Sequence, residues 1–309
     1  MIRYHLGWED AEGRPQDASG KGLRPALCLL ACEAAGGDWQ RALPAAAAVE
    51  LVHNFSLIHD DIQDRDEERH HRPTVWSIWG EAQAINAGDA LLALARPLVL
   101  RLADERVLQA TVIEAARVLD ESTLEMVAGQ TLDIAFEDKS DVEVPAYFQM
   151  VRQKSGALFD CSLRLGVLAA AADWELAERL GMVGRTLGTA FQIIDDMLGV
   201  WGDQSKTGKA AGADVYRRKK SLPIVYALSE GNEEVRDGMR AIYEKPALCA
   251  EDVAQVGHYL DEVGARDYCE RQAVELKESA IEELRRLDLL PGPCEEIIQM
   301  AEFLLEREF

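Results

Sequence analysis

Two groups of aspartates, one in each half of the chain, are the residues best suited to chemistry. The first group is Asp60, Asp61 and Asp64, and the second is Asp195 and Asp196. Each group stands at the end of an apolar run that is compatible with a helix. Mg²⁺ prefers carboxylate oxygens, and when held in this way it commonly carries a phosphorylated substrate. The two groups therefore predict a magnesium site for a phosphorylated molecule.

The spacing within the first group supports this interpretation. On a helix, Asp60 and Asp64 project from the same face, with about 6 Å between their Cα atoms along the axis. Their like charges repel each other unless a cation lies between them. A solvated acidic face is the plain alternative, because such a motif also arises by chance. The second group, at the end of another apolar run, favours the metal.

Basic and polar side chains accompany both groups, as a phosphorylated ligand would require. Each of them alone is more simply read as a surface charge, and their order along the chain is what gives them weight. His53 lies two helical turns before Asp60 and so on the same face, although a buried core histidine is the alternative. The candidates for substrate binding are Lys21, Arg24, His53, Arg69, His70, Lys154, Ser155, Gln192, Lys209 and Lys219.

Long helices must position these residues. The chain is rich in Ala, Leu and Glu, has only 10 prolines among 309 residues, and shows no alternating strand pattern. We expect an all-α bundle of long helices around a central pocket or tunnel. The predicted helices cover residues 42–62, 78–103, 106–137, 146–172 and 174–201, followed by several shorter ones over residues 222–309.

A few residues mark the expected helix ends. Pro145 suits the first turn of the helix that follows it, and Asp173 is a candidate N-cap. The segment Pro291-Gly292-Pro293 is interpreted as a stop. No Gly-, Ser- or Pro-rich linker divides the chain, so a single domain over residues 1–309 is predicted.

Composition excludes several functions. The net charge of −22 argues against a nucleic-acid surface and against attraction to anionic membranes. No apolar run is long enough to span a membrane, and the polar first 20 residues do not resemble a signal peptide. The six cysteines are scattered without a zinc-binding spacing, and Cys28 and Cys32 are read as core thiols. A cytosolic, reduced protein is expected.

Taken in order, these residues resemble the motifs of the trans-isoprenyl diphosphate synthases, the polyprenyl synthetase family. The resemblance runs from Lys21 to the last helix and combines several motifs in the family's order. The segments that carry it are Gly20–Pro25, His53–Asp64, Gly129-Gln130 with Asp133, Lys154-Ser155, Phe191–Asp196, Gly208-Lys209, Asp214 and Lys219–Pro223.

The resemblance implies a homodimeric, magnesium-dependent prenyltransferase with a deep apolar tunnel. Such an enzyme condenses isopentenyl diphosphate with an allylic diphosphate, and about three Mg²⁺ ions per active site are implied. The implied catalytic residues are Asp60, Asp61, Asp64, Lys154, Gln192, Asp195 and Asp196. The implied metal set is drawn from Asp60, Asp61, Asp64, Asp195 and Asp196, with Asp60, Asp64 and Asp195 on the allylic diphosphate.

The same resemblance divides the basic residues between two substrates. Lys21, Arg24 and His53 would hold isopentenyl diphosphate. The allylic diphosphate would be contacted by Arg69, Lys154, Lys209 and Lys219. Gln192 and the backbone near Lys154-Ser155 would face the allylic cation, and the proton lost at the end would pass to the departing diphosphate.

The chain departs from the family's motifs at a few positions. Gly199 stands where the family usually has a third aspartate, which predicts a weakened outer contact with the metal rather than its loss. Arg69-His70-His71 replaces an Arg-Arg-Gly motif, and Arg72 is the candidate for the missing second arginine. Because Lys21 comes early, the chain is expected either to lack the family's usual first helix or to start late.

The aromatic ring of Phe55 is the candidate for limiting product length. It lies five residues before Asp60, about 7.5 Å along the helix axis, and in similar enzymes an aromatic residue here accompanies short products. Geranylgeranyl diphosphate (C20) is the expected product, with farnesyl (C15) or longer products as alternatives and plain core packing as the other explanation of Phe55. A class I terpene cyclase, a non-catalytic synthase subunit and a helical scaffold are the remaining rivals.

Overall fold

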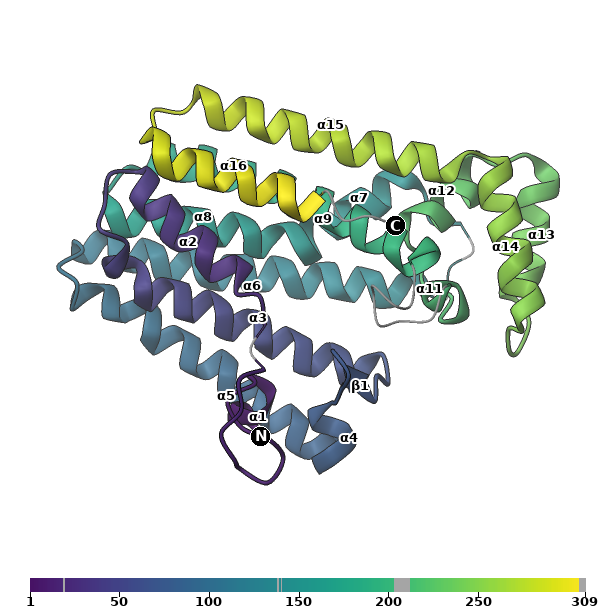
Figure 1. Cartoon of the computed structure of the whole chain (residues 1–309), viewed down its shortest axis with the longest axis horizontal. Helices are drawn as coiled ribbons and strands as arrows, with labels where there is room; N and C mark the ends of the chain where they lie inside the picture. Colours follow the sequence, from purple (N-terminus) through teal and green to yellow (C-terminus); the bar gives the residue numbers. More distant parts are fainter. Residues whose placement is uncertain (19, 138, 140, 203–211, 306–309) are drawn as a thin grey trace. The chain divides into compact units, whose positions relative to one another are not determined.

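The computed structural model describes residues 1–18, 20–137, 139, 141–202 and 212–305. Helices dominate these residues (Figure 1), which confirms the predicted all-α class. The α-helices are α1 (Ile2–His5), α2 (Leu23–Ala34), α3 (Leu43–Gln63), α4 (Val75–Trp79), α5 (Glu81–Leu100), α6 (Gln109–Glu137), α7 (Val144–Val151), α8 (Ala157–Ala170), α9 (Trp174–Trp201), α11 (Ala213–Tyr216), α12 (Leu222–Glu230), α13 (Glu233–Tyr243), α14 (Ala250–Glu262), α15 (Ala265–Arg286) and α16 (Pro291–Leu305). Shorter turns are η1 (Trp39–Ala42), η2 (Arg101–Ala103) and the π-helical turn η3 (Arg152–Gly156).

The two helices that carry the aspartate groups lie where the sequence predicts them. α3 matches the expected helix to within a residue at each end, and α9 has the expected bounds. The N-cap prediction is confirmed, because Asp173 Oδ1 accepts a hydrogen bond from Leu176 N at 2.9 Å. Pro145 stands in the first turn of α7, as expected.

Two predicted helix boundaries are wrong. The single helix expected over residues 78–103 is divided by Gly80, whose φ of 84° ends α4 before α5 begins. The predicted stop at Pro291-Gly292-Pro293 instead begins α16, while α15 ends earlier, at Arg286. A proline at the first helical position loses no hydrogen bond, so the same residue can open a helix.

A small antiparallel hairpin follows α3, although the sequence predicts no strand. β1 (Glu68–Arg69) pairs with β2 (Arg72–Pro73), with Arg69 opposite Arg72. His70 and His71 form the two-residue loop with φ values of 51° and 60°, as a type I′ turn requires. Strands of two residues are too short to show an alternating pattern, so sequence periodicity could not reveal them.

The chain divides into two compact units, each assembled from separate stretches of sequence. Unit 1 comprises Met1–Thr123, Leu158–Met182 and Leu287–Ile297. Unit 2 comprises Leu124–Ala157, Val183–Arg286 and Ile298–Phe309. No single linker can separate units that share the chain in this way. The prediction of one domain over residues 1–309 stays a prediction.

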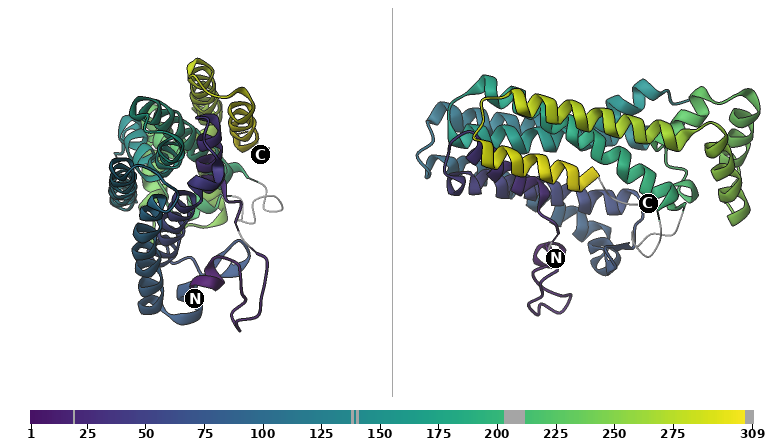
Figure 2. Two further views of the ribbon diagram at one scale, coloured as in Figure 1. Left: turned by 90° about the vertical axis from the view of Figure 1, so that its left-hand side faces the viewer. Right: turned by 45° about the horizontal axis from the view of Figure 1, so that its top comes forward.

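In unit 1, α3 packs along α5 and also against α2 (Figures 1 and 2). Small residues make this close packing possible, since Ala45 and Ala48 on α3 are fully buried. Gly88 on α5 leaves room for the imidazole of His59, because a Cβ there would lie 2.3 Å from His59 Nε2. α3 is therefore fixed along its length, and with it the first aspartate group at its end.

In unit 2, two apolar clusters fix the end of α9 and the start of α12. The first cluster includes Tyr147, Met150, Val151, Ile193, Ile194, Met197, Leu222, Val225 and Cys269. The second includes Val200, Val215, Ile224, Val235, Met239, Val256 and Leu260. Residues from α9 and α12 appear in both clusters, so the second aspartate group stands on a helix end that is packed on several sides.

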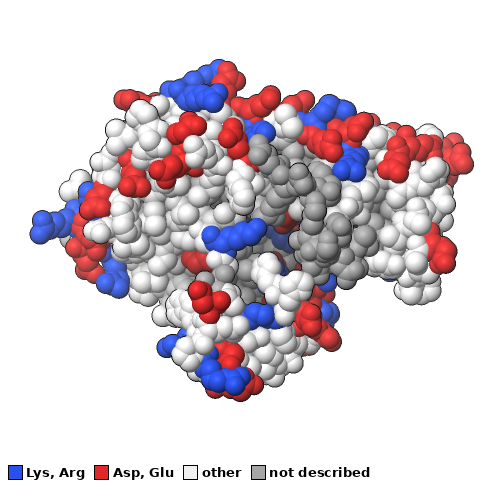
Figure 3. Space-filling model, viewed as in Figure 1, with Lys and Arg blue, Asp and Glu red and all other residues white. Residues whose placement is uncertain are grey.

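The surface follows the composition. Acidic side chains are spread over the face shown in Figure 3, with basic side chains in smaller groups among them. No helix in the described ranges combines the length and apolar character needed to cross a membrane. The prediction that Cys28 and Cys32 are core thiols is confirmed, since both are fully buried and unpaired with other sulfurs.

Candidate active site

The first aspartate group lies at the C-terminal end of α3, in unit 1. Asp60 is half-buried, and Asp64, the C-cap residue, is exposed. Asp61 is turned the other way and is only 1% exposed. Residues four apart share a helix face while adjacent residues do not, so α3 offers Asp60 and Asp64 to a ligand and directs Asp61 inward.

Asp61 is held by Arg69 of the hairpin. Arg69 Nε donates to Asp61 Oδ1 at 2.7 Å, whereas Asp61 Oδ2 is buried without a hydrogen-bond partner. Burial raises the pKa of the Asp61 carboxyl to about 6, although the charge and hydrogen bond of Arg69 act in the opposite direction. An oxygen left unsatisfied in the interior costs stability, so this carboxyl group is not in its most stable surroundings.

The hairpin that carries Arg69 is held in turn by α1. Tyr4 Oη donates to Pro73 O at 2.8 Å, and Arg72 Nη2 donates to Tyr4 O at 2.8 Å. The Arg72 guanidinium also lies over the Tyr4 ring, 4.3 Å from its centroid. Arg72, the candidate for the missing second arginine, thus binds α1, and His70 is exposed in the turn beside it.

The residues predicted to hold isopentenyl diphosphate also lie in unit 1. Arg24 Nη1 is 3.1 Å from His53 Nε2. Burial, followed by the charge of Arg24, lowers the pKa of His53 well below its ordinary value, so the neutral imidazole accepts from Arg24. Gly22, with a φ of 59°, precedes α2, and exposed Lys21 precedes Gly22. The N-terminus of α2 therefore lies beside two cationic side chains, Lys21 and Arg24, which suits an anion.

Phe55 lies one turn before His59 on α3. It is 7% exposed, and its ring meets that of His59 edge to face with centroids 4.8 Å apart. The ring is therefore held in place by packing. This position is compatible both with a wall that limits chain growth and with an ordinary core contact.

The second aspartate group lies near the end of α9, in unit 2, and its two members differ in the same way as Asp60 and Asp61. Asp195 is exposed and Asp196 is 1% exposed. Asp196 Oδ2 accepts from Tyr147 Oη at 2.6 Å and from Leu222 N at 3.0 Å. Asp196 Oδ1 accepts from Gln192 Nε2 at 3.0 Å and from Lys219 Nζ at 3.4 Å. Both oxygens of Asp196 are thus fully engaged.

Lys219 links the second group to Asp214. Its Nζ lies 3.4 Å from Asp196 Oδ1 and 3.9 Å from Asp214 Oδ2. Burial by itself lowers the pKa of the Lys219 ammonium, but Asp196, Asp214 and Asp133 outweigh burial and raise that pKa well above its ordinary value. Lys219 is therefore a permanent cation beside the second group.

Asp214 lies directly against Gly199, the position at which a third aspartate is expected from the resemblance. A Cβ at position 199 would lie 2.1 Å from Asp214 Oδ2 and 2.4 Å from Asp214 Cγ. The Asp214 carboxylate, which comes from α11, therefore fills the space next to α9 that a side chain at position 199 would need.

Asp133, which follows Gly129-Gln130 on α6, forms an ion pair with Lys154. Lys154 Nζ donates to Asp133 Oδ2 at 2.5 Å. Burial tends to raise the pKa of Asp133, yet Lys154 and Lys219 lower it overall. One turn earlier on α6, a Cβ at Gly129 would lie 2.2 Å from Lys154 N. The glycine therefore allows α6 to approach the π-helical turn η3 closely enough for the ion pair.

Ser155 and Gln192 are joined directly. Ser155 Oγ donates to Gln192 Oε1 at 2.6 Å, and the same glutamine amide donates to Asp196. Ser155 lies in η3, between α7 and α8, and π-helical turns of this kind are frequent at functional sites. Hydrogen bonds thus connect η3 to the second aspartate group.

These side chains surround one hollow in unit 2. Its lining residues are Asp133, Met150, Val151, Lys154, Gln192, Asp196, Lys219 and Lys220. The hollow measures about 10 Å³, room for about one water molecule. The polar groups occupy the space by pairing with one another, so a ligand must displace some of these contacts to enter.

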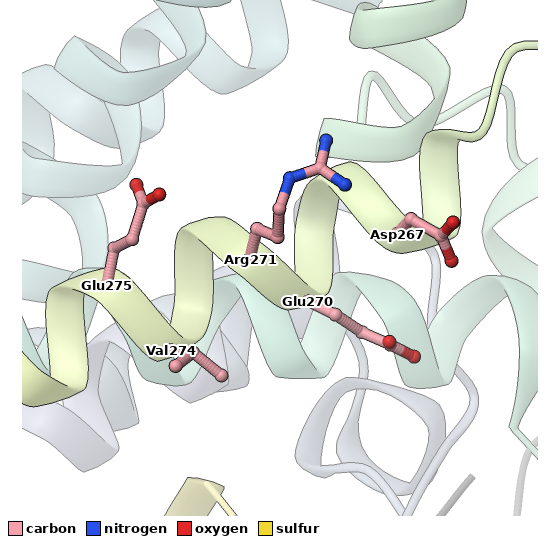
Figure 4. A pocket seen from close by; sticks show the side chains of 5 residues that line it. All are labelled: Asp267, Glu270, Arg271, Val274 and Glu275. Carbon is pink, nitrogen blue, oxygen red and sulfur yellow. The ribbon is translucent and has the colours of Figure 1, made fainter.

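A larger hollow of about 540 Å³ in unit 2 is lined by residues of α15 alone (Figure 4). Its side chains are Asp267, Glu270, Arg271, Val274 and Glu275. In Figure 4 they do not converge on one point. The smaller hollow is the candidate site, because three lysines, two carboxylates and an amide line it.

The structure thus joins the predicted residues into groups. In unit 1 it pairs Arg24 with His53 and Asp61 with Arg69. In unit 2 it joins Lys154, Gln192, Asp196 and Lys219 around one hollow, with Ser155 bonded to Gln192. Lys209 lies outside the described residues. Across the described ranges, no three His, Cys, Asp or Glu side chains gather as they would around a bound ion.

Sequence reasoning missed Tyr147 and did not place Asp214 in the site. Tyr147 is seven residues before Lys154, which is two helical turns, and this spacing is a signal that could have revealed it. The signal for Asp214 was its place among the family motifs, although only the tertiary packing of α11 brings it to Gly199.

Comparison with known proteins gives matches to a single family. The family model for polyprenyl synthetase matches residues 14–260. Two Mycobacterium tuberculosis H37Rv proteins match the whole chain and 86% of their own length: a geranylgeranyl diphosphate synthase, 40% identical over 310 residues, and a (2E,6E)-farnesyl diphosphate synthase, 39% identical over 312 residues.

A solved structure shows the same fold. The polyprenyl synthetase from Streptomyces coelicolor A3(2) superposes with a TM-score of 0.89 and 38% identity, covering 98% of this chain and 90% of its own. The sequence motifs, the helical fold and these matches lead to one conclusion. The chain belongs to the polyprenyl synthetase family, the trans-isoprenyl diphosphate synthases.

Proposed function

We propose that this prenyltransferase condenses isopentenyl diphosphate with an allylic diphosphate to give a short trans-prenyl diphosphate. The observation that carries the proposal is the hollow of unit 2, where Lys154 and Lys219 meet Gln192 and Asp196. Cations there suit the charge that grows on a departing diphosphate, and the amide suits the cation left behind.

Mg²⁺ is the proposed cofactor, and the accessible carboxylates fit it. Asp60 and Asp64 share one face of α3, and Asp195 is exposed on α9. One or two carboxylates with water and phosphate oxygens are the usual shell of Mg²⁺. Asp61 and Asp196, although in the predicted metal set, are buried and bonded to protein donors, so we propose that they act indirectly. About three ions per site remain the proposed number.

When bound, Mg²⁺ would neutralise charge on the allylic diphosphate. The protein side chains do the rest. Lys154 and Lys219 receive the diphosphate as the allylic C–O bond breaks and its electron pair leaves with oxygen. Gln192 Oε1 and the backbone carbonyls near Lys154-Ser155 would present the negative ends of their dipoles to the allylic cation. The double bond of isopentenyl diphosphate attacks that cation, and a proton then passes to the released diphosphate.

We propose that Lys21, Arg24 and His53 bind the diphosphate of isopentenyl diphosphate. The N-terminus of α2 and the guanidinium of Arg24 suit a doubly charged group. Neutral His53 fixes Arg24 by accepting its hydrogen bond. Arg69 is proposed to contact the allylic diphosphate from the hairpin, with exposed His70 beside it.

C20 is the product that we propose, with C15 as the alternative. The named farnesyl and geranylgeranyl relatives are almost equally similar to this chain, so the proposal rests on the position of the Phe55 ring before Asp60 on α3. The purified protein is incubated with Mg²⁺, isopentenyl diphosphate and C5, C10 or C15 allylic primers, and product lengths are measured. Condensation with none of them would refute the function.

Phe55→Ala tests the length limit. We expect longer products than those of the wild-type protein, because the ring no longer blocks the growing chain. Phe303→Ala removes a ring that is 67% exposed and is the matched control. An unchanged product distribution for Phe55→Ala would leave Phe55 as core packing.

The same assay separates the rival functions. A class I terpene cyclase would convert an allylic diphosphate without isopentenyl diphosphate, and Lys21, Arg24 and His53 would have no ligand. A non-catalytic subunit would need a partner for activity. The intact Asp–Lys contacts of unit 2 favour catalysis by this chain.

A homodimer is proposed from the surface of α6. Ile113, Leu124, Val127 and Ile134 are exposed on this helix, and their spacing places them within one face. Sedimentation should show a dimer that Ile113→Glu with Leu124→Glu weakens, whereas an unchanged dimer would exclude this face. The cytoplasmic location and the lack of nucleic-acid binding stay predictions.

A further inference from the structure

Four hydrogen-bond donors occupy the acceptor positions of the Asp196 carboxylate. Tyr147 Oη and Leu222 N approach one oxygen, and Gln192 Nε2 and Lys219 Nζ approach the other. A carboxylate has about four acceptor sites. With 1% of its surface exposed, Asp196 is built to bind protein groups, unlike exposed Asp195 beside it.

These contacts decide which way the amide of Gln192 faces. A carboxylate can only accept, so the Gln192 NH₂ group must face Asp196. Gln192 Oε1 is then directed to Ser155 Oγ, which donates to it at 2.6 Å. The reversed amide could still donate to Ser155 Oγ, but it would turn its oxygen toward the Asp196 carboxylate and lose that hydrogen bond. Asp196 therefore determines which end of the Gln192 amide faces Ser155.

Tyr147 contacts Asp196 without lining the hollow itself. It is fully buried in the apolar cluster of unit 2 and does not line the hollow. A buried phenol needs a partner for its hydroxyl, and Tyr147 donates to Asp196 at 2.6 Å. Tyr147 on α7 and Ser155 in η3 lie on one continuous helical segment, so the contacts form a closed circuit with α9 through Asp196 and Gln192.

We propose that Tyr147 and Asp196 are positioning residues, which fix the amide of Gln192 toward Ser155 and do not bind the metal. The proposal rests on the proposed prenyl transfer, in which this amide faces the allylic cation. Misplacing the amide slows bond breaking, while the diphosphate sites stay intact. The expected signature is a lower kcat with little change in KM.

The first test is a double-mutant cycle. We expect Tyr147→Phe to lower kcat about tenfold and to leave KM for both substrates within about twofold, since a displacement of 1 Å can cost up to about 100-fold. In a Gln192→Ala background, Tyr147→Phe should have no further effect beyond about twofold, because its target is gone. Tyr268→Phe, which changes a half-buried tyrosine of the same cluster, is the matched control.

The second test measures binding without turnover. Calorimetry follows pyrophosphate binding in the presence of Mg²⁺ for the wild type, Asp195→Asn and Asp196→Asn, with thermal unfolding as the check on folding. We expect about a tenfold or larger loss of affinity for Asp195→Asn and less than about threefold for Asp196→Asn. Should Asp196→Asn not fold, Tyr147→Phe takes its place, with the same expected retention of affinity.

The outcomes separate the two proposals. Additive losses in the cycle, or equal losses of Mg²⁺-dependent affinity for Asp195→Asn and Asp196→Asn, would overturn the positioning roles while the function stands. A wild-type protein that neither condenses the substrates nor binds pyrophosphate with Mg²⁺ would overturn the function, and the positioning roles with it.

Discussion

In both aspartate groups the second carboxylate is turned into the protein, yet the two are satisfied very differently. Asp61 accepts one hydrogen bond from Arg69, and its other oxygen is buried without one. Asp196 accepts from four donors on three sequence segments. Both are 1% exposed, so burial alone does not distinguish them.

The difference shows two uses of a buried carboxylate. Asp61 is under-satisfied and its pKa is raised to about 6, so the group around it can change when a ligand or ion neutralises nearby charge. Asp196 is fully paired and holds α7, α9 and α12 together. A buried polar network in which every group is hydrogen-bonded makes the local structure rigid. A buried group without a hydrogen bond lowers the stability of the folded state.

The largest expected effect lies outside this buried pair, on the accessible face of the first group. Asp60→Asn should lower kcat/KM by about 10³-fold or more, about 4 kcal/mol, because an anionic ligand of the proposed metal is lost. Steady-state kinetics at several Mg²⁺ concentrations measure this. Asp104→Asn, at an exposed ion pair, is the control and should leave the rate unchanged. Equal activity of both variants would remove Asp60 from the site.

Asp196→Asn tests how much the hydrogen bonds of the buried carboxylate contribute to the free energy of unfolding. We expect the free energy of unfolding to fall by about 3 kcal/mol, since a neutral amide cannot accept from all four donors and Lys219 loses its partner. Asp195→Asn, one residue away and exposed, should cost less than about 1 kcal/mol. Urea denaturation compares them. Similar costs would show that the donors around Asp196 add little.

Asp61 should make the free energy of unfolding of the metal-free protein depend on pH. Its folded pKa of about 6 exceeds the ordinary value of 3.8, so the folded state binds this proton more tightly than the unfolded state. The wild type therefore loses up to about 3 kcal/mol relative to Asp61→Asn as pH rises from about 4 to about 6.

The difference between the two proteins is the quantity to measure, by urea denaturation in EDTA. Burial lowers the pKa of His5 to about 4, and its effect on stability has the opposite sign in the same pH range. Because His5 is present in both proteins, its contribution cancels. A difference that stays constant between pH 4 and pH 6 would contradict the raised pKa of Asp61.

Gly199 gives the smallest expected effect. Gly199→Ala places a Cβ against the Asp214 carboxylate and should cost about 2 kcal/mol of stability through overpacking. Combined with Asp214→Ala, the same change should cost less, because the overlapping group is gone. Thermal unfolding of the single and double variants measures this coupling. Additive costs would mean that Asp214 does not fill the space at Gly199.

Sequence reasoning reached α3 and α9 because long apolar runs ending in aspartates carry a strong local signal. It failed at Gly80 and Pro291, where a single residue ends or begins a helix according to its surroundings. It also failed at the hairpin, because the hairpin depends on hydrogen bonds of Arg72 and Pro73 with Tyr4, which is far away in the chain. Local pattern is informative only where many residues agree.

The sequence by itself determined the helical class, the family motifs and the candidate residues, because residue type and spacing set propensity and chemistry. Only the tertiary structure decided which carboxylates point outward. Helical geometry separates Asp60 from Asp61 in direction, but packing decides which side is the interior. Likewise, Tyr147, Leu222 and Asp214 reach the second group only when α7, α12 and α11 pack near α9, and no local pattern encodes such contacts.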